Sequence, residues 1–266
     1  MNVLVALAAV LVLAAAAYLL TLVVPATGWV FGVFLPYAAL ATFVGGFVYR
    51  VYKWATIPVP FGIATTCGQQ KSLDFIEANT LENPPTRLHV LGRMVLEVLL
   101  FRSLFRNTRA ELRSGPRLGY HSNEWLWLFG LCFHYSFLII FLRHFRLFTH
   151  PTPFFVEGLE YVDGFLQIGV PVFYITDALI LFGVTALFVR RVWSAHLRYI
   201  SLVADYFPLF LIGGIAATGI LMRYWLKVDV SGVTDLMISF FSFNPSLPEG
   251  LHPIFFAHVL LCLLYT

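Results

Sequence analysis

Three histidines lie inside strongly apolar segments of this sequence: His134, His144 and His258. His134 and His144 are ten residues apart in one apolar segment, and His258 lies in the last one. An imidazole in such surroundings must be hydrogen-bonded, carry protons or bind a metal. The other five histidines lie in polar segments or at the ends of apolar ones, where an interfacial position is expected: His89, His121, His150, His196 and His252.

The composition identifies the environment of these histidines. Of the 266 residues, 59% are hydrophobic and only 12% are charged, and the mean hydropathy is +0.82. A spanning helix needs about 20 mostly apolar residues, and six segments are candidates. They are about 3–24, 29–52, 124–148, 167–189, 201–225 and a last one from His252. The prediction is an all-α integral membrane protein with about six transmembrane helices, the first of them uncleaved.

Basic residues predict the orientation of the helices. Ten of the 17 Lys and Arg residues lie between Arg50 and Arg117, whereas 149–166 and 226–251 together contain one Lys and no Arg. The positive-inside rule therefore places the first of these regions in the cytoplasm. We expect an N-terminal helical hairpin (1–53), a cytoplasmic loop with an amphipathic helix at 90–105 (54–122) and a helical bundle (123–266). This distribution accounts for the net charge of +3, so no nucleic-acid partner is expected.

Helix geometry predicts the depth of each histidine. At 1.5 Å per residue, His144 lies about 6 Å and His258 about 9 Å below the outer surface, and His134 lies about 15 Å deeper than His144. Two imidazoles at one depth on different helices form the axial arrangement of a b-type haem. The rings of His134 and His144 are about 80° apart around the helix, so they can serve separate haems in one bundle.

Other functions for these histidines remain open. Each could be hydrogen-bonded to a neighbouring helix in a non-redox membrane anchor, or carry protons in a transporter. A transporter is expected to have internal repeats or interrupted helices, and the sequence has neither. Zinc or copper is disfavoured because no acidic or thiolate ligand lies at the same level.

Several charged residues in or near the apolar segments could also take part. Arg143 and Arg146 could pair with haem propionates or extend to the membrane interface. Asp177 could belong to a proton path or be a hydrogen-bonded structural acid. Asp205 is expected to pair with Arg190, Arg191 or Arg198.

The three cysteines carry little information. Cys132 and Cys262 are expected to be small buried hydrophobic residues, and their spacing fits neither a disulfide framework nor a metal site. Cys67 lies in a polar segment and could be reactive.

Several short motifs together resemble a known family. They are Phe133-His134, His144, Arg190-Arg191, Ala204-Asp205 and Ala257-His258. This set resembles the membrane cytochrome b (gamma) subunit of respiratory nitrate reductase. The segments Pro58-Val59-Pro60-Phe61 and Thr65-Thr66-Cys67-Gly68-Gln69-Gln70-Lys71-Ser72-Leu73, with the extra N-terminal helix, look like the DsrM-type relative associated with dissimilatory sulfite reductase.

The resemblance implies a haem b subunit in the cytoplasmic membrane, acting as the electron-transfer subunit of a quinone-linked oxidoreductase complex in sulfur metabolism. Implied partners are a cytoplasmic iron-sulfur subunit related to heterodisulfide reductase, and further membrane and periplasmic cytochrome c or iron-sulfur subunits. By resemblance, His144 and His258 hold an outer haem and His134 an inner one. The family's basic residue at the quinone site has no counterpart here, so Asp163, Tyr161 and Gln167 are the candidates by position.

The C-terminal end departs from the family pattern. A second ligand for the inner haem is expected about 18 residues after His258, but the chain stops at Thr266. The 15 residues from His252 onward span about 22 Å, less than the roughly 30 Å hydrocarbon core. We therefore expect this sequence to lack the C-terminal part of the natural protein.

Overall fold

The computed structural model describes residues 1–58, 74–106, 109–115, 117–167 and 171–265. It divides into two compact units, one made of Met1–Arg50 and Cys132–Thr266 and the other of Val51–Leu131. The motif at 59–73, including Cys67, lies outside the described residues.

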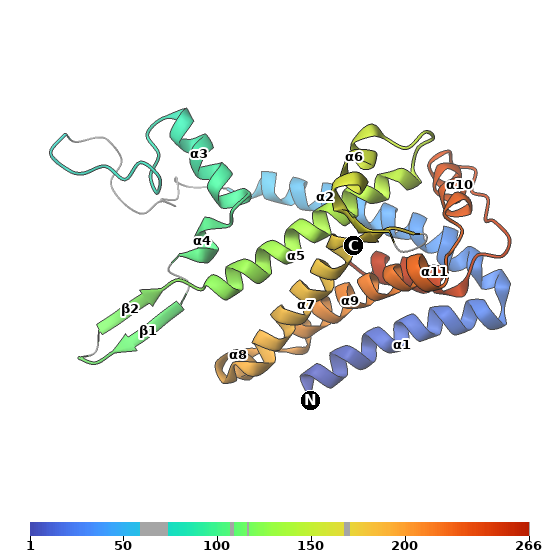
Figure 1. Ribbon diagram of the computed structural model, residues 1–266, viewed down its shortest axis with the longest axis horizontal. Coiled ribbons are helices and arrows are strands. Elements are labelled where there is room, and N and C mark those ends of the chain that lie inside the picture. Colours follow the sequence, from blue (N-terminus) through green and yellow to red (C-terminus); the bar gives the residue numbers. More distant parts are fainter. Residues whose placement is uncertain (59–73, 107–108, 116, 168–170, 266) are drawn as a thin grey trace. The chain divides into compact units, whose positions relative to one another are not determined.

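The first unit is a bundle of helices (Figure 1). Its helices are α1 (Asn2–Val23), α2 (Leu35–Thr56) as far as Arg50, α5 (Glu124–Arg143) from Cys132, α6 (Phe154–Asp163), α7 (Ile175–Trp193), α8 (Ala195–Ile200), α9 (Val203–Ile220), α10 (Val230–Phe241) and α11 (Pro253–Leu263). Short 3-10 helices are η1 (Pro25–Thr27) and η3 (His144–Leu147), and π-helices are η2 (Val30–Phe34) and η4 (Leu221–Trp225). Two short antiparallel strands, β3 (Gly164–Leu166) and β4 (Phe173–Tyr174), precede α7.

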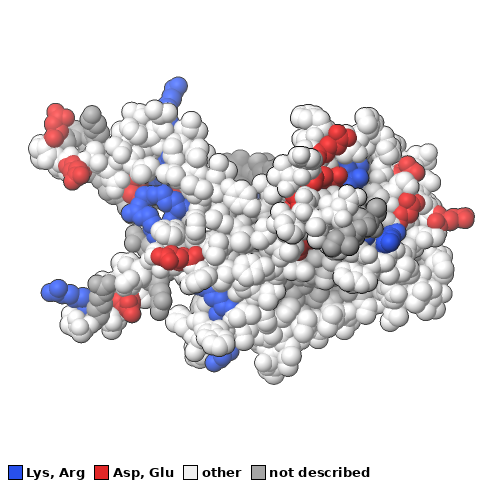
Figure 2. Space-filling view, in the orientation of Figure 1, with Lys and Arg blue, Asp and Glu red and all other residues white. Residues whose placement is uncertain are grey.

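Four helical segments in the described residues are long and apolar enough to cross a membrane. They are Asn2–Val23, Pro25–Thr56, Glu124–Leu147 and Val203–Trp225. With the 19-residue α7 and the shorter apolar helices α10 and α11, they confirm the predicted all-α membrane bundle. In Figure 2 the face over the bundle is largely uncharged, and acidic and basic side chains gather toward its ends, as expected for a surface in lipid.

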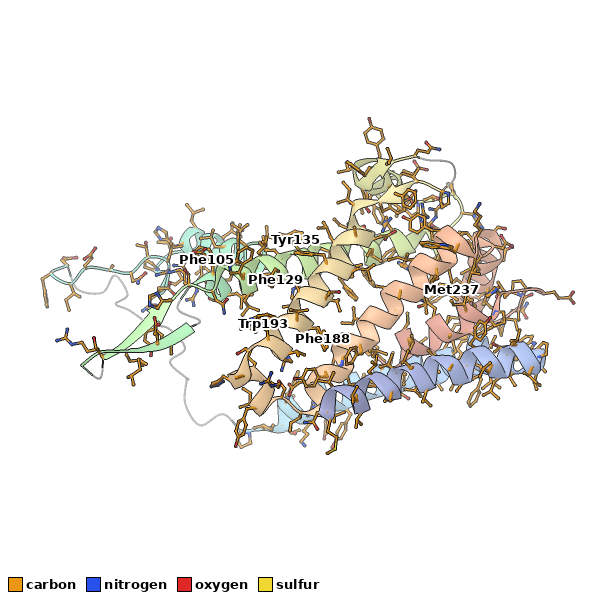
Figure 3. The ribbon with its side chains drawn as sticks, turned by 60° about the horizontal axis from the view of Figure 1, so that its bottom comes forward. Phe105, Phe129, Tyr135, Phe188, Trp193 and Met237 are labelled. Carbon is orange, nitrogen blue, oxygen red and sulfur yellow. The ribbon has the colours of Figure 1, made fainter. Side chains whose placement is uncertain are left out.

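The bundle core joins helices distant in sequence. Helix α1 packs on α9 and α11, and α9 also packs on α7 and α11. Val10, Leu211 and Leu261 meet in one buried cluster. On the α7 side, Phe188 (labelled in Figure 3) has its ring centroid 5.1 Å from that of Phe210.

Proline and a side-chain cap set two helix ends in the bundle. Helix α1 stops before Pro25, and the preceding residue, Val24, has left the helical conformation with φ of −128° and ψ of 85°, because proline disfavours the α region for the residue before it. Helix α11 begins at Pro253 after His252, whose Nδ1 accepts a hydrogen bond from the Ile254 amide at 3.2 Å. A proline at the first helical position loses no helical hydrogen bond.

The fourth helix starts later than its sequence predicts. The prediction was Gln167–Val189, whereas α7 begins at Ile175. The apolar residues before it instead form the β3 and β4 hairpin, in which Gly164 pairs with Tyr174. Helices α6 and α10, in the segments between the predicted spans, were not predicted.

The second unit contains α3 (Arg87–Val98), α4 (Arg102–Phe105), and the antiparallel strands β1 (Arg109–Arg113) and β2 (Arg117–His121). The amphipathic helix predicted at 90–105 is therefore two helices, separated at Phe101, whose φ is +49°. Glu97 stabilises the break because its carboxylate accepts hydrogen bonds from the Ser103 amide at 2.8 Å and from Arg102 at 3.3 Å.

Candidate functional site

His144 and His258 line one cavity of about 230 Å³ in the first unit. His144 lies where α5 changes into η3, and His258 lies in the middle of α11. The structure thus brings together, from different helices, the two histidines that the depth calculation placed at one level.

Both imidazoles are held through Nδ1. The Nδ1 of His144 lies 2.7 Å from the Ile140 carbonyl oxygen, which can only accept, so this nitrogen carries the proton. The Nδ1 of His258 lies 2.8 Å from the Thr218 hydroxyl oxygen, and that hydroxyl donates to the Gly214 carbonyl at 2.8 Å. His258 Nδ1 is therefore also the donor, and each ring keeps an Nε2 lone pair that can bind a metal.

Small residues of α9 leave space beside His258. A Cβ atom at Gly219 would lie 3.5 Å from Cε1 of His258, and Ala216 lines the cavity one turn earlier. Two neutral imidazoles facing one largely apolar cavity with a small-residue wall fit a flat bis-histidine group such as a b-type haem. Within the described residues no cluster of three or more His, Cys, Asp or Glu could hold a metal ion.

Arg143 anchors a buried charged cluster beside the cavity. Its guanidinium lies 3.3 Å from Asp163 and 3.2 Å from Asp177, and 3.8 Å from the ring centroid of Tyr174. Asp163 also accepts hydrogen bonds from the Thr176 amide at 2.9 Å and from its hydroxyl at 2.5 Å. The cluster ties α6 to the start of α7 and fixes the residue that precedes His144.

A second cavity of about 480 Å³ adjoins the first, sharing Tyr174, Asp177 and Ile220 with it. Its lining is mostly apolar and aromatic and includes Phe165, Phe173, Leu181, Tyr224 and Trp225. The Tyr224 ring stacks on Phe173 with centroids 4.7 Å apart, and its hydroxyl donates to Asp177 at 2.7 Å.

Comparison with known proteins identifies the family. The chain is 40% identical over 238 residues to the Hdr-like menaquinol oxidoreductase cytochrome b-like subunit of Archaeoglobus fulgidus, covering 87% of this chain and 71% of the relative. It belongs to this family. The corresponding subunit of Archaeoglobus profundus is 40% identical over 231 residues, covering 84% of this chain and 68% of the relative. No family model matches the sequence, and no solved structure matches it.

Within this cytochrome b-like family member, the predicted quinone-site residues have different surroundings. Asp163 is buried, with a relative exposure of 6%. Tyr161 is 88% exposed, and Gln167 is also exposed. Neither Tyr161 nor Gln167 is among the residues that line the two cavities described above.

The remaining predicted residues are also accounted for. His134 lies on an exposed face of α5, with its ring centroid 4.9 Å from that of Phe133, and does not line the His144 cavity. Arg146 pairs with Glu160 at 2.6 Å. Asp205 pairs with Arg191 at 3.6 Å, one of the predicted partners.

The sequence prediction missed three residues of this site: Thr218, Arg223 and Tyr224. Thr218 and Tyr224 have no sequence signal, because hydroxyl side chains are common in membrane helices and their partners are 40 and 47 residues away. Arg223 did have one. It is a charge within an apolar segment, at the end that the positive-inside rule predicts to be outer, where basic residues are disfavoured.

Proposed function

We propose that this chain binds a b-type haem through His144 and His258 and transfers electrons between a membrane quinol and other subunits of an oxidoreductase complex. One observation carries the proposal: both histidines line one cavity, and the Nδ1 of each is committed to a hydrogen bond. Haem b, when bound, supplies reversible one-electron transfer. The named relatives act as menaquinol oxidoreductase subunits, which favours menaquinol as the electron donor.

The chain's own residues have separate tasks in this proposal. Ile140 and Thr218 orient the two imidazoles and hold the ring proton on Nδ1, so that Nε2 of each ring keeps its lone pair. The apolar wall of α9 excludes water. The salt-bridged cluster around Arg143 holds the helix end that carries His144.

The adjoining apolar cavity is the proposed site of the quinol ring. Aromatic walls such as Phe173 and Tyr224 suit a flat apolar ring, and this cavity shares three lining residues with the one that contains the histidines. Asp163, the buried member of the set predicted by position, supports this wall through Arg143 and Thr176.

The finer assignments are also proposals. His134 is the proposed first ligand of an inner haem. By resemblance, we infer a DsrM-type subunit of the cytoplasmic membrane that acts in sulfur metabolism. The same resemblance favours a cytoplasmic heterodisulfide-reductase-like iron-sulfur partner, with the 54–122 segment on the cytoplasmic side.

Visible spectroscopy of the purified protein tests the ligation. The reduced-minus-oxidised spectrum is expected to show a b-type haem band, and His144→Ala or His258→Ala should each remove the same haem. His252→Ala is the control, because His252 caps α11 instead of lining the cavity. Absence of the band, or a band of undiminished intensity in both cavity variants, would refute the proposal.

A further inference from the structure

Three arginines line the cavity that contains His144 and His258: Arg143, Arg146 and Arg223. Two have carboxylate partners within the chain. Arg143 lies between two aspartates, and Arg146 pairs with Glu160 at 2.6 Å. Because a carboxylate already neutralises each of these two guanidinium groups, a further anion would stabilise them less.

Arg223 has no such partner. All 14 Asp and Glu residues lie in the described part of the chain, and none of them forms an ion pair within 4.0 Å of Arg223. Its guanidinium donates to the Val172 carbonyl oxygen at 3.3 Å, while its Nε is buried without a hydrogen-bond partner among the described residues. The Nε of Arg143 is buried in the same way, so it is the missing carboxylate that distinguishes Arg223. A buried cationic donor without an acceptor is costly.

An aromatic contact does not replace the missing acceptor. The guanidinium carbon of Arg223 lies 4.2 Å from the Tyr174 ring centroid. The ring face attracts the charge but offers no lone pair in the plane of the N–H groups. A carboxylate would, because it can accept two parallel hydrogen bonds from a guanidinium.

The place of Arg223 on its helix indicates where this carboxylate comes from. Gly219, beside His258, is four residues before Arg223, and both line the same cavity. Residues four apart lie on one side of a helix, about 6 Å apart along its axis. Arg223 is therefore about one turn beyond the histidine, within the same cavity.

We propose that Arg223 binds a carboxylate and that this carboxylate is a propionate group of the haem held by His144 and His258. The inference rests on the proposed function. It replaces Arg143 and Arg146 as the first candidates for this role, because Arg223 alone of the three lacks a carboxylate partner. Arg223 thereby orients the haem in the cavity and favours the reduced form through its positive charge.

A chemical double-mutant cycle tests the contact. The apoprotein, as the full chain in detergent, is reconstituted with haem b or with its dimethyl ester, which has no carboxylate. The midpoint potential of the His144-dependent haem is then measured for the wild type and Arg223→Gln. With haem b, Arg223→Gln is expected to lower the equilibrium constant for reduction about tenfold, which is about 59 mV for one electron. With the ester, the change should be less than half as large.

Arg146→Gln is the matched control. It removes another cation from the same cavity, but one that Glu160 already holds, so its effect should be similar with both haems. Arg223→Lys keeps the charge without the planar pair of donors and should give a potential between those of the wild type and Arg223→Gln.

The outcomes separate this inference from the proposed function. If the wild type binds a His144-dependent haem, but Arg223→Gln changes its potential equally with haem b and ester, or not at all, Arg223 does not bind a propionate and the haem ligation still stands. Equal effects with both haems, together with a wild-type potential that shifts on addition of acetate while that of Arg223→Gln does not, would indicate a free anion instead. If the wild type binds no such haem, both proposals are wrong. If Arg223→Gln binds haem too weakly to titrate, dissociation constants for haem b and for its ester are measured in the wild type and in Arg223→Lys. The ratio of the two constants, compared between these proteins, then measures the coupling between Arg223 and the haem carboxylate.

Discussion

The two cavity histidines are oriented by different kinds of acceptor. His144 donates to a backbone carbonyl of its own helix, four residues earlier, whereas His258 donates to a side chain of another helix. A side chain can be removed without altering the backbone, so the role of the hydrogen bond that orients the imidazole can be tested at His258 by changing Thr218.

Thr218→Val should weaken haem binding. Valine has nearly the shape of threonine but no hydroxyl, so the Nδ1 proton of His258 loses its acceptor, and loss of such a supporting bond typically costs about 10- to 100-fold in metal affinity. The haem dissociation constant, measured by titrating the apoprotein, is expected to rise about tenfold. Thr218→Ser keeps the hydroxyl and should bind almost as tightly as the wild type. Equal affinity of the valine and serine variants would contradict this role.

At the scale of helices, the site depends on how closely α7 approaches α5. A Cβ atom at Gly183 would lie 3.0 Å from the backbone nitrogen of Phe133 and 3.1 Å from its Cα. Small residues allow such close packing between membrane helices. This contact holds α7, which carries Thr176 and Asp177, against α5, which ends at Arg143, next to His144.

Gly183→Ala is therefore expected to destabilise the bundle. The added methyl group meets backbone atoms, which cannot rotate away, and overpacking of this kind costs about 1–3 kcal/mol. Thermal unfolding in detergent should show a lower transition temperature. Gly45→Ala is the control because nothing lies within 4 Å of a Cβ at that helical position, and it should leave the transition unchanged or raise it slightly. A similar transition for both variants would disprove the close-packing argument.

The length of the apolar segments and the depth of the histidines predicted the helical bundle and the shared cavity better than the sequence predicted the segments between the helices. The prediction of a helical membrane bundle was correct, and His144 and His258 do share a cavity, because helical rise converts sequence position into depth. The predicted start of α7 was wrong by eight residues, because the apolar residues around Gly164 and Phe173 suit a strand as well as a helix. Contacts such as Tyr224 with Asp177 depend on tertiary packing, which no local pattern encodes.

At the scale of the whole molecule, each unit has its own group of ion pairs. In the first unit, the ion pairs of Arg143 and Arg146 lie at the His144 cavity. In the second, Glu82 accepts hydrogen bonds from Arg102 at 2.7 Å and from Arg106 at 2.9 Å. The hydrogen bond from Arg102 is the main reason that the pKa of Glu82 lies below its ordinary value of 4.5.

The second unit should therefore lose local stability in acid. Because the pKa of Glu82 is lowered by folding, its contribution is complete above pH 4.5 and disappears as the pH falls through the lower pKa of the folded state. Hydrogen exchange of the α3 and α4 amides, corrected for the intrinsic effect of pH, should become faster over that range. Glu82→Gln should reduce this pH dependence, whereas Glu77→Gln, at an exposed position, should retain it. Identical pH dependence in wild type and Glu82→Gln would rule out this contribution.

The π-helix η4 has a consequence for how the two cavities can vary. Its wider turn, closed by the Leu226 amide on the Leu221 carbonyl at 2.9 Å, contains one residue more than an α-turn. Arg223 lines the histidine cavity and the next residue, Tyr224, lines the aromatic one. Insertion or deletion of one residue here would rotate both side chains around the helix axis by about 100°. The two compartments are therefore constrained to evolve together at this turn.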